Sequence, residues 1–427
     1  MTEQIDVIIV GAGVAGLSAA AALRQGGMRC AVLEAGARIG GRAFTAHPAE
    51  LGHAAFDHGA SWLHAAGRNP LVPIAQAHGD TLFDSDGPRV RRVGIAGRLA
   101  DAAELAAYAR AQEVFGRVAA ARAVRMPDIS FTEGVAPLRD DPWTATLTNW
   151  EARLIAAADP DDFSLRDWHA NELDGENLVV AGGIGAFVAA RLGPPAGEVA
   201  LATPVHRLDW RDGVAAHTPG GILRARAAIV TASTGVLAAG HIRFDPALPG
   251  HVLAALDGLP MGLLSKVAMR VTDIGRLGLP ANCSLQRRLA PGEGGMFFNV
   301  RPRETDVVIG FVGGPTAWEL ARAGTAAAGA FAREQWRLSL GTDADGVLGP
   351  AVVTQWGTDA LQLGAYAYAR PGHAGARAVL GTPLGDGRLV FAGEAVCTDG
   401  LAGTVGGAWL SGRQAAQGVM AALASVA

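Results

Sequence analysis

The start of the chain carries a glycine-rich turn of the kind that holds a phosphate. Its glycines are Gly11, Gly13 and Gly16. The first permits a tight turn, the second lets backbone N–H groups approach a pyrophosphate, and the third lets a helix pack on a strand. Glu34 follows at a spacing where its carboxylate can accept hydrogen bonds from a ribose. These residue types in this order predict a dinucleotide site.

The elements around this turn must form a βαβ unit. The apolar segment 5–10 predicts a strand, the alanine-rich segment after the turn predicts a helix, and residues 29–33 predict a second strand that ends at Glu34. A glycine-rich turn alone also occurs by chance. Strand, helix, second strand and terminal acid together make the interpretation specific, and the N-terminus of the helix adds an attraction for an anion.

The segment after Glu34 adds groups that suit a phosphate. Arg38, Gly41 and Arg42 lie in it. Arginine can bind phosphate through two parallel hydrogen bonds, and glycine allows the backbone to come close. An exposed loop rich in arginine and glycine is the alternative. The segment resembles the FAD-binding start of the flavin-containing amine oxidase family.

The resemblance continues in order along the whole chain. Residues 59–64 are similar to a segment that polyamine oxidases of this family carry beside the flavin, and Lys266 matches the family's lysine at the flavin. Residues 356–359 and 364–368 match the wall of the active site, and 391–394 with 403–408 match the second FAD segment. The resemblance implies FAD as the cofactor. The residues expected to bind FAD are Gly11, Gly13, Gly16, Glu34, Arg38, Gly41, Arg42, Gly59, Ala60, Ser61, Val205, Trp356, Gly393, Glu394, Thr404 and Val405.

Four residues are implied as catalytic: Lys266, Tyr366, His64 and Trp62. Lys266 is the only lysine in the chain, and the resemblance puts it at flavin N5, where an ammonium can position a water and offer positive potential to oxygen. Tyr366 is implied as a wall of an aromatic cage that orients the amine, with an ordinary half-buried strand as the alternative. His64 can accept a hydrogen bond or a proton from a substrate ammonium, whereas a satisfied or surface histidine is the alternative.

Two departures from the family pattern refine these expectations. Ala365 stands where monoamine oxidases place the cysteine that attaches the flavin, so FAD is expected to be held non-covalently. Thr404 stands where some relatives have a second cage tyrosine, which leaves only one aromatic wall assured.

The expected fold is α/β: a two-domain, Rossmann-like FAD-binding flavoprotein of the amine oxidase type, with an interleaved substrate domain built on a mixed sheet. Residues 1–68, 177–254 and 385–427 are assigned to the FAD-binding domain, and residues 69–176 and 255–384 to the substrate-binding domain. Within the first set, residues 204–208 and 227–232 predict strands. The segment 102–124 in the second set predicts one long helix.

Composition limits the partners. Half of the residues are hydrophobic and 18% are charged, which excludes a disordered chain. The net charge of −4 and the lack of a basic cluster with aromatics make nucleic acid an unexpected partner. Three scattered cysteines predict neither a disulfide framework nor a metal site. No signal peptide and no apolar stretch of about 18 to 20 residues is present, so we expect a cytoplasmic protein without membrane association.

The resemblance implies oxidation of an amine, with small-molecule amine and O2 as partners. Hydride leaves the carbon next to nitrogen, the imine hydrolyses to aldehyde plus amine, and O2 becomes H2O2. A polyamine or related secondary amine is the expected substrate, and an L-amino-acid oxidase or a flavin-binding protein without turnover are the alternatives. The acidic residues Glu172, Asp174 and Glu176 either line an entrance for a polycation or form a solvated loop. The chain is expected to be a monomer or a homodimer.

Overall fold

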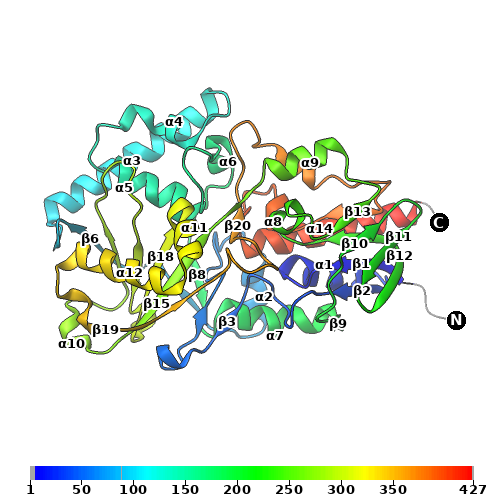
Figure 1. The fold of residues 1–427 in the computed structure, drawn as a ribbon, viewed down its shortest axis with the longest axis horizontal. Helices are drawn as coiled ribbons and strands as arrows, with labels where there is room; N and C mark the ends of the chain where they lie inside the picture. The colour runs from blue at the N-terminus through cyan, green and yellow to red at the C-terminus, as the bar shows by residue number, and fades with distance from the viewer. Residues whose placement is uncertain (1–4, 88, 426–427) are drawn as a thin grey trace.

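The two strands of the first βαβ unit belong to a large sheet (Figure 1). The computed structural model describes residues 5–87 and 89–425. The unit consists of β1 (Ile5–Val10), α1 (Val14–Gln25) and β2 (Cys30–Leu33), as the sequence predicts. β1 pairs in parallel with β2 on one side and with β12 (Gly221–Val230) on the other. This parallel pairing aligns the carboxyl ends of the three strands at one edge, next to the glycine turn.

Eight strands form this first sheet, in the order β13-β10-β11-β12-β1-β2-β9, with β21 paired to β12. The remaining strands are β9 (Val199–Ala200), β10 (Arg207–Asp209), β11 (Val214–Thr218), β13 (Arg243–Asp245) and β21 (Leu389–Phe391). The strand predicted over 204–208 is wrong in its first three residues, since β10 begins at Arg207. Pro204 has no N–H to donate to a neighbouring strand. Val205 instead lies in the wall of a cavity.

Helices cover both faces of the first sheet. Val7 and Ile9 of β1 belong to one buried cluster, and Ile8 and Val10 belong to another. This alternation is what a strand buried on both faces requires. The first cluster is completed by α1, α7 (Ile184–Ala196) and α14 (Val405–Ala424). The second is completed by α8 (Thr234–Ala238), α9 (Gly250–Asp257) and α13 (Ala376–Leu380).

A second sheet of seven strands runs in the order β19-β15-β18-β17-β16-β6-β7. Its strands are β6 (Val90–Ile95), β7 (Arg98–Leu99), β15 (Leu264–Val271), β16 (Cys283–Arg287), β17 (Phe297–Val300), β18 (Val307–Gly313) and β19 (Leu348–Val353). It is mixed, because β6 and β16 are parallel and the other pairs are antiparallel. Trp336 of α12 (Thr325–Leu340) packs edge-on against Phe298, 5.1 Å between ring centroids. The helices α10 (Ile274–Leu277) and α11 (Gly314–Ala323) complete this layer.

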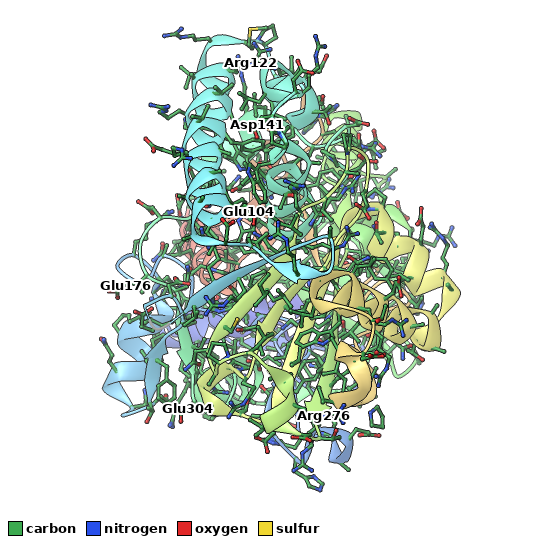
Figure 2. The ribbon with its side chains drawn as sticks, turned by 90° about the vertical axis from the view of Figure 1, so that its left-hand side faces the viewer. Glu104, Arg122, Asp141, Glu176, Arg276 and Glu304 are labelled. Carbon is green, nitrogen blue, oxygen red and sulfur yellow. The ribbon has the colours of Figure 1, made fainter. Side chains whose placement is uncertain are left out.

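A helical region stands beside the second sheet (Figure 2). Its longest helix, α3 (Ala102–Arg125), agrees with the predicted 102–124 and carries Glu104 near one end and Arg122 near the other. Asp101 and Glu104 form a capping box that satisfies the first N–H groups of this helix. The other members are α4 (Phe131–Val135), α5 (Thr144–Thr148), a π-helix (Asn149–Ile155) and α6 (Leu165–Ala170).

Short elements connect these layers. They are α2 (Leu71–Ala77) and three two-stranded sheets: β3 (Thr45–Ala46) with β4 (Phe56–Asp57), β5 (Leu82–Asp84) with β8 (Leu178–Val180), and β14 (Met261–Gly262) with β20 (Tyr366–Ala367). Each strand of the eight-stranded sheet lies inside the ranges assigned to the FAD-binding domain. The boundaries of the two domains stay a prediction.

Two further observations concern the described residues only. None of the helices in residues 5–87 and 89–425 is both long enough and apolar enough to cross a bilayer. In the same residues, no three His, Cys, Asp or Glu side chains come together in a way that could hold a metal ion.

The contact between α1 and α14 depends on a glycine. A Cβ at Gly412 would lie 2.1 Å from the carbonyl oxygen of Ala15, which is a backbone atom that cannot turn away. We therefore expect Gly412→Ala to lower the free energy of unfolding by about 1 to 3 kcal/mol, measured by chemical denaturation. Gly418→Ala in the same helix is the matched control, since a Cβ there meets no atom within 4 Å. It should raise stability by about 0.5 to 1 kcal/mol. Equal effects of the two variants would contradict this account of the contact.

Candidate active site

A cavity of about 480 Å³ lies where the first sheet, the second sheet and the helical region meet. All three parts contribute to its wall. The first sheet contributes the glycine turn and the ends of β1 and β2, the second sheet contributes Lys266 of β15, and the helical region contributes Trp168 of α6. One end therefore presents the groups predicted for a dinucleotide. The other end is lined mainly by aromatic and aliphatic side chains, among them Trp62, Leu154, Phe163, Trp168, Tyr366 and Tyr368.

The structure brings together nearly all the residues that the sequence analysis selected. The four predicted catalytic residues line the cavity, and so do the predicted FAD-binding residues except Gly16 and Arg38. Gly16 lies behind the turn: a Cβ there would be 2.0 Å from the carbonyl oxygen of Gly11, so it permits the close helix–strand packing that was its predicted role. Arg38 sits with its guanidinium carbon 4.1 Å from the ring centroid of Phe44. Its role at a phosphate stays a prediction.

The glycine turn has the geometry that an approaching phosphate needs. Gly11 has a φ of +102°, which favours glycine, and a Cβ there would lie 2.5 Å from Oγ1 of Thr231. A Cβ at Gly13 would meet nothing within 4 Å, so that position is open. Two helix N-termini face this end of the cavity, those of α1 at Val14 and of α14 at Val405. Both favour a negatively charged group.

The carboxylate of Glu34, at the end of β2, is held in place by backbone N–H groups of the glycine turn and of the segment after β2. One carboxylate oxygen accepts a hydrogen bond from the N–H of Ala12 and the other from the N–H of Gly36, each at 2.7 Å. Each oxygen keeps a further lone pair. The carboxylate therefore fits a ribose hydroxyl beside the pyrophosphate position.

A second acid, Glu394, connects Arg42, a predicted cofactor-binding residue, to the segment that contains Tyr366. It receives a hydrogen bond of 2.7 Å from Nη1 of Arg42, and its two oxygens lie 3.1 and 3.3 Å from the N–H of Ala367. The same Nη1 donates to the carbonyl of Ala365 at 2.9 Å. Arg42 thus donates to a carboxylate and to a carbonyl, and its binding of a phosphate stays a prediction.

Lys266 occupies the middle of the wall with three acceptors around its ammonium. Nζ donates to the carbonyls of Asp57 at 2.7 Å and Gly59 at 2.5 Å, and to Oγ of Ser61 at 2.5 Å. The side chain is buried, with 3% of the residue exposed. Burial lowers the pKa of Lys266 to about 8, and the nearby charge of Asp57 opposes this shift. Both the charged and the neutral form are therefore accessible close to neutral pH.

Aromatic side chains flank this ammonium. Nζ of Lys266 lies 6.0 Å from the ring centroid of Trp62 and 5.6 Å from that of Phe311. Trp356 is held by a hydrogen bond of 2.8 Å from its ring N–H to the carbonyl of His58. The Tyr366 hydroxyl donates to the carbonyl of Leu154, in the π-helix, at 3.2 Å. Burial, with the charge of Glu394, raises the pKa of Tyr366, so the phenol stays neutral.

His64 is oriented by two residues that the sequence analysis did not select. Its Nδ1 lies 2.7 Å from Oδ1 of Asn177, and Nδ2 of Asn177 donates to Asp86 at 2.8 Å. Because a carboxylate only accepts, Asp86 fixes which way the Asn177 amide points, and the amide oxygen then accepts from Nδ1–H of His64. Nε2 is left as the acceptor. Burial lowers the pKa of His64, against the hydrogen bond to Asn177 and the charge of Asp86.

Thr404 serves the backbone rather than a cage. Its hydroxyl donates to the carbonyl of Leu401 at 2.7 Å and accepts from the N–H of Gly407 at 3.0 Å, which caps α14. The position that some relatives fill with a second tyrosine is therefore a helix start in this chain. Thr231, His58 and Trp168 also line the cavity and carried no motif that would have selected them.

Comparisons with known proteins agree with this geometry. Residues 135–420 match the family described as "Flavin containing amine oxidoreductase", and residues 9–73 match the family described as "NAD(P)-binding Rossmann-like domain". Polyamine oxidase 5 of Oryza sativa subsp. japonica is 28% identical, over 96% of this chain and 87% of that protein. Lysine-specific histone demethylase 1 homolog 2 of the same organism is 30% identical, over 97% of this chain but only 57% of that protein.

Solved structures show the same fold. Putrescine oxidase bound to putrescine superimposes with a TM-score of 0.80 at 22% identity, covering 98% of this chain and 99% of that one. Cyclohexylamine oxidase from Brevibacterium oxydans IH-35A gives a TM-score of 0.75 at 23% identity, covering 99% and 100%. These likenesses confirm the two-domain α/β fold predicted from the sequence.

The family match covers most of the chain, and the cavity offers FAD a glycine turn, an acid at the end of β2 and two helix N-termini. The chain therefore belongs to the family of flavin-containing amine oxidoreductases and is an FAD-dependent enzyme that acts on amines.

Proposed function

We propose that this enzyme is an oxidase that takes a hydride from the carbon next to an amine nitrogen. The nitrogen gives up a proton, the resulting imine is hydrolysed to an aldehyde and an amine, and O2 is reduced to H2O2. FAD supplies the two-electron redox chemistry. The observation that supports the proposal most is the position of Lys266, a buried lysine in the cavity wall between the predicted cofactor residues and the aromatic end.

Lys266 is proposed to hold positive charge where oxygen takes up electrons. A preorganised charge in a site shielded from water stabilises the negative charge that develops on oxygen. The three acceptors around Nζ hold the ammonium in place, so no reorganisation is needed when the reaction occurs.

His64 is proposed to receive the proton from the substrate nitrogen. An ammonium has no lone pair to support hydride loss from the neighbouring carbon, so the amine must be neutral when it reacts. The bare Nε2 of His64 can accept that proton, and Trp62 lies beside it with ring centroids 5.8 Å apart. Tyr366 and Trp356 are proposed to orient the amine and exclude water.

The cofactor is proposed to be non-covalent, since Ala365 in the cavity wall has no thiol. The cytoplasmic location and the monomeric or homodimeric state that the sequence predicts also remain predictions.

A polyamine or related secondary amine is the first candidate substrate. The polyamine oxidase and putrescine oxidase among the similar proteins support this choice. So does the loop that follows α6, because Asn171 and Leu173 line the cavity while Glu172, Asp174 and Glu176 of the same loop are exposed. Figure 2 shows Glu176 at the outer surface. We propose that these acids meet a second ammonium at the rim.

A monoamine is the second candidate, favoured by the interior of the cavity. Among the described wall residues the acids are Glu34, Asp167 and Glu394, and each already accepts hydrogen bonds from protein donors. The arginines of the same wall, Arg42 and Arg377, already donate to carboxylates, which disfavours the clamp that an L-amino acid would need. The aromatic end therefore suits an apolar amine body.

Replacing the lysine tests the oxidase proposal. We expect Lys266→Met to slow flavin reduction or its reoxidation by O2 at least about tenfold, measured by rapid mixing. The acceleration that depends on the ammonium should be present below pH 8 and lost as the pH rises through about 8, the pKa of Lys266. Lys266→Met should not show this transition. Unchanged rates in the variant would refute the role of the lysine.

The orientation of His64 can be tested by changing Asp86, which acts on His64 through Asn177. Asp86→Asn lets the Asn177 amide turn over, so His64 loses its fixed tautomer, and we expect kcat/KM to fall about tenfold to a hundredfold. Asn177→Leu should have a similar effect. Because both act through His64, the double variant should be little worse than either single variant. Independent, multiplying losses would show that the three residues do not act as one chain.

A substrate panel separates the candidate substrates. Peroxide release is measured with spermidine, benzylamine and L-amino acids. The triple variant Glu172→Gln/Asp174→Asn/Glu176→Gln should raise KM for spermidine about threefold to tenfold and leave benzylamine unaffected. Preference for benzylamine, with no effect of the triple variant on either amine, would favour the monoamine. Activity on amino acids alone would overturn both, and peroxide release with any amine excludes a flavin-binding protein without turnover.

A further inference from the structure

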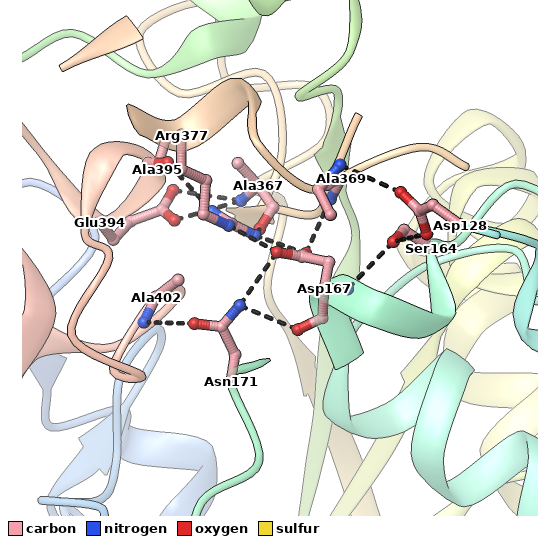
Figure 3. A network of polar contacts seen from close by, with 11 residues as sticks. Asp128, Ser164, Asp167, Asn171, Ala367, Ala369, Arg377, Glu394, Ala395 and Ala402 are labelled. Carbon is pink, nitrogen blue, oxygen red and sulfur yellow. Dashed lines mark hydrogen bonds and ion pairs between the residues drawn. The ribbon is translucent and has the colours of Figure 1, made fainter. Parts of the chain in front are cut away.

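A buried ion pair lies in the cavity wall and has no role in the chemistry described so far (Figure 3). Arg377 of α13 donates through Nε and Nη2 to the two oxygens of Asp167 of α6, both at 2.8 Å. Arg377 is 5% exposed and Asp167 is 3% exposed, and both line the cavity. They come from the first sheet's helical layer and from the helical region, so the pair bridges two parts of the fold.

The pair is fully engaged. Besides the guanidinium, Asp167 accepts from the amide of Asn171 and from the N–H of Ala369, each at 2.9 Å. The remaining bonds of Arg377 go to the carbonyls of Ala367 at 3.1 Å and Ala395 at 3.0 Å. Neither charge is left over for a substrate, so the pair acts on other protein groups.

The two carbonyls adjoin residues that the proposed reaction uses. Ala367 follows Tyr366, the predicted aromatic wall, and Ala395 follows Glu394, the predicted FAD-binding acid. Glu394 itself accepts from the N–H of Ala367, so the two segments are also tied directly. One guanidinium therefore holds the backbone beside the substrate wall and the backbone beside the cofactor wall at a fixed separation, as the dashed lines in Figure 3 show.

The same tyrosine is fixed at its other end. Its hydroxyl donates to the carbonyl of Leu154, so Tyr366 is held at its phenol and, one residue further along the backbone, at the carbonyl of Ala367. A flat guanidinium can serve one carboxylate and two carbonyls at once, which a lysine ammonium at the same place cannot match in geometry. Apolar residues often replace a buried ion pair without loss of stability, so stability alone does not account for this pair.

We propose that Asp167 and Arg377 are positioning residues for hydride transfer. They set the distance between Tyr366 and the flavin-binding segment at Glu394, and thereby hold the reacting carbon of the amine in reach of the cofactor. The inference rests on the proposed oxidation of amines. A displacement of about 1 Å at such a wall is enough to slow a reaction a hundredfold.

The first test is Arg377→Lys in the FAD-loaded enzyme. This variant keeps the charge beside Asp167 but loses the bonds to the two carbonyls. We expect flavin reduction by the amine to slow about tenfold. Reoxidation by O2, measured per bound FAD, should stay at the wild-type level, because it does not depend on where the amine sits. An equal loss in both half-reactions would indicate a general structural defect and overturn the positioning role.

A double-mutant cycle shows whether the effect passes through the tyrosine. In a Tyr366→Ala background the wall is already gone, so Arg377→Lys should have no further effect on flavin reduction. The same slowing in both backgrounds would overturn the proposal. Should Arg377→Lys fail to fold, Asp167→Leu/Arg377→Met removes both charges together and enters the same cycle with the same expectation.

Arg191→Lys is the matched control. Arg191 of α7 makes the same two-pronged contact with Asp80, at 2.8 and 2.9 Å, and neither residue lines the cavity. It should leave flavin reduction unchanged. Reduction of the wild-type flavin by an amine is measured first: its absence would overturn the proposed function and the positioning role with it. A reducible wild type with an unaffected Arg377→Lys variant would overturn the positioning role alone.

Discussion

The buried ammonium of Lys266 is the interaction on which the arrangement of the cavity depends. Charge is costly to bury unless it is fully hydrogen-bonded, and an ammonium has three donors to satisfy. All three go to the segment from Asp57 to Ser61, which leads from β4 into the cavity wall. Strand β15 of the second sheet is thereby joined to the chain that lines the cofactor end. The two sheets cannot move apart here without leaving a buried charge unsatisfied.

That segment must come unusually close to its neighbours, and glycine makes the approach possible. A Cβ at Gly59 would lie 1.7 Å from the carbonyl oxygen of Arg42, so no other residue fits without moving the backbone. The same argument holds where the π-helix meets the second sheet, since a Cβ at Gly313 of β18 would lie 1.7 Å from the carbonyl oxygen of Arg153. The segment that holds Lys266 and the π-helix that holds Tyr366 therefore each depend on a glycine at a close backbone contact. Both contacts bring backbone against backbone, which no side-chain rotation can relieve.

Local sequence signals made the dinucleotide-binding groups and the lysine of the site predictable. The glycine turn, the acid at the end of β2 and the start of α14 are each encoded within a few neighbouring residues, and Lys266 stands out because the chain has no other lysine. The contacts that orient these groups join distant positions. His64 and Asn177 are 113 residues apart, and Asp167 and Arg377 are 210 apart. Asp167 and Arg377 carry no motif, and arginine is too frequent in this chain for one of them to be noticed. Arg38 was selected by its local sequence, since its neighbours resemble a phosphate loop; its side chain lies on Phe44, and its role at a phosphate stays a prediction.

The lone lysine is also the one cation that this position accepts. An ammonium places three donors around one atom, and the acceptors of Asp57, Gly59 and Ser61 lie within 2.7 Å of it. A guanidinium spreads five donors over a flat fork and stays charged at every pH in the physiological range. It would leave donors unpaired in a wall that offers only three acceptors, and it could not lose its proton near neutral pH. In a chain that uses arginine almost everywhere else, the geometry of these three acceptors favours lysine here.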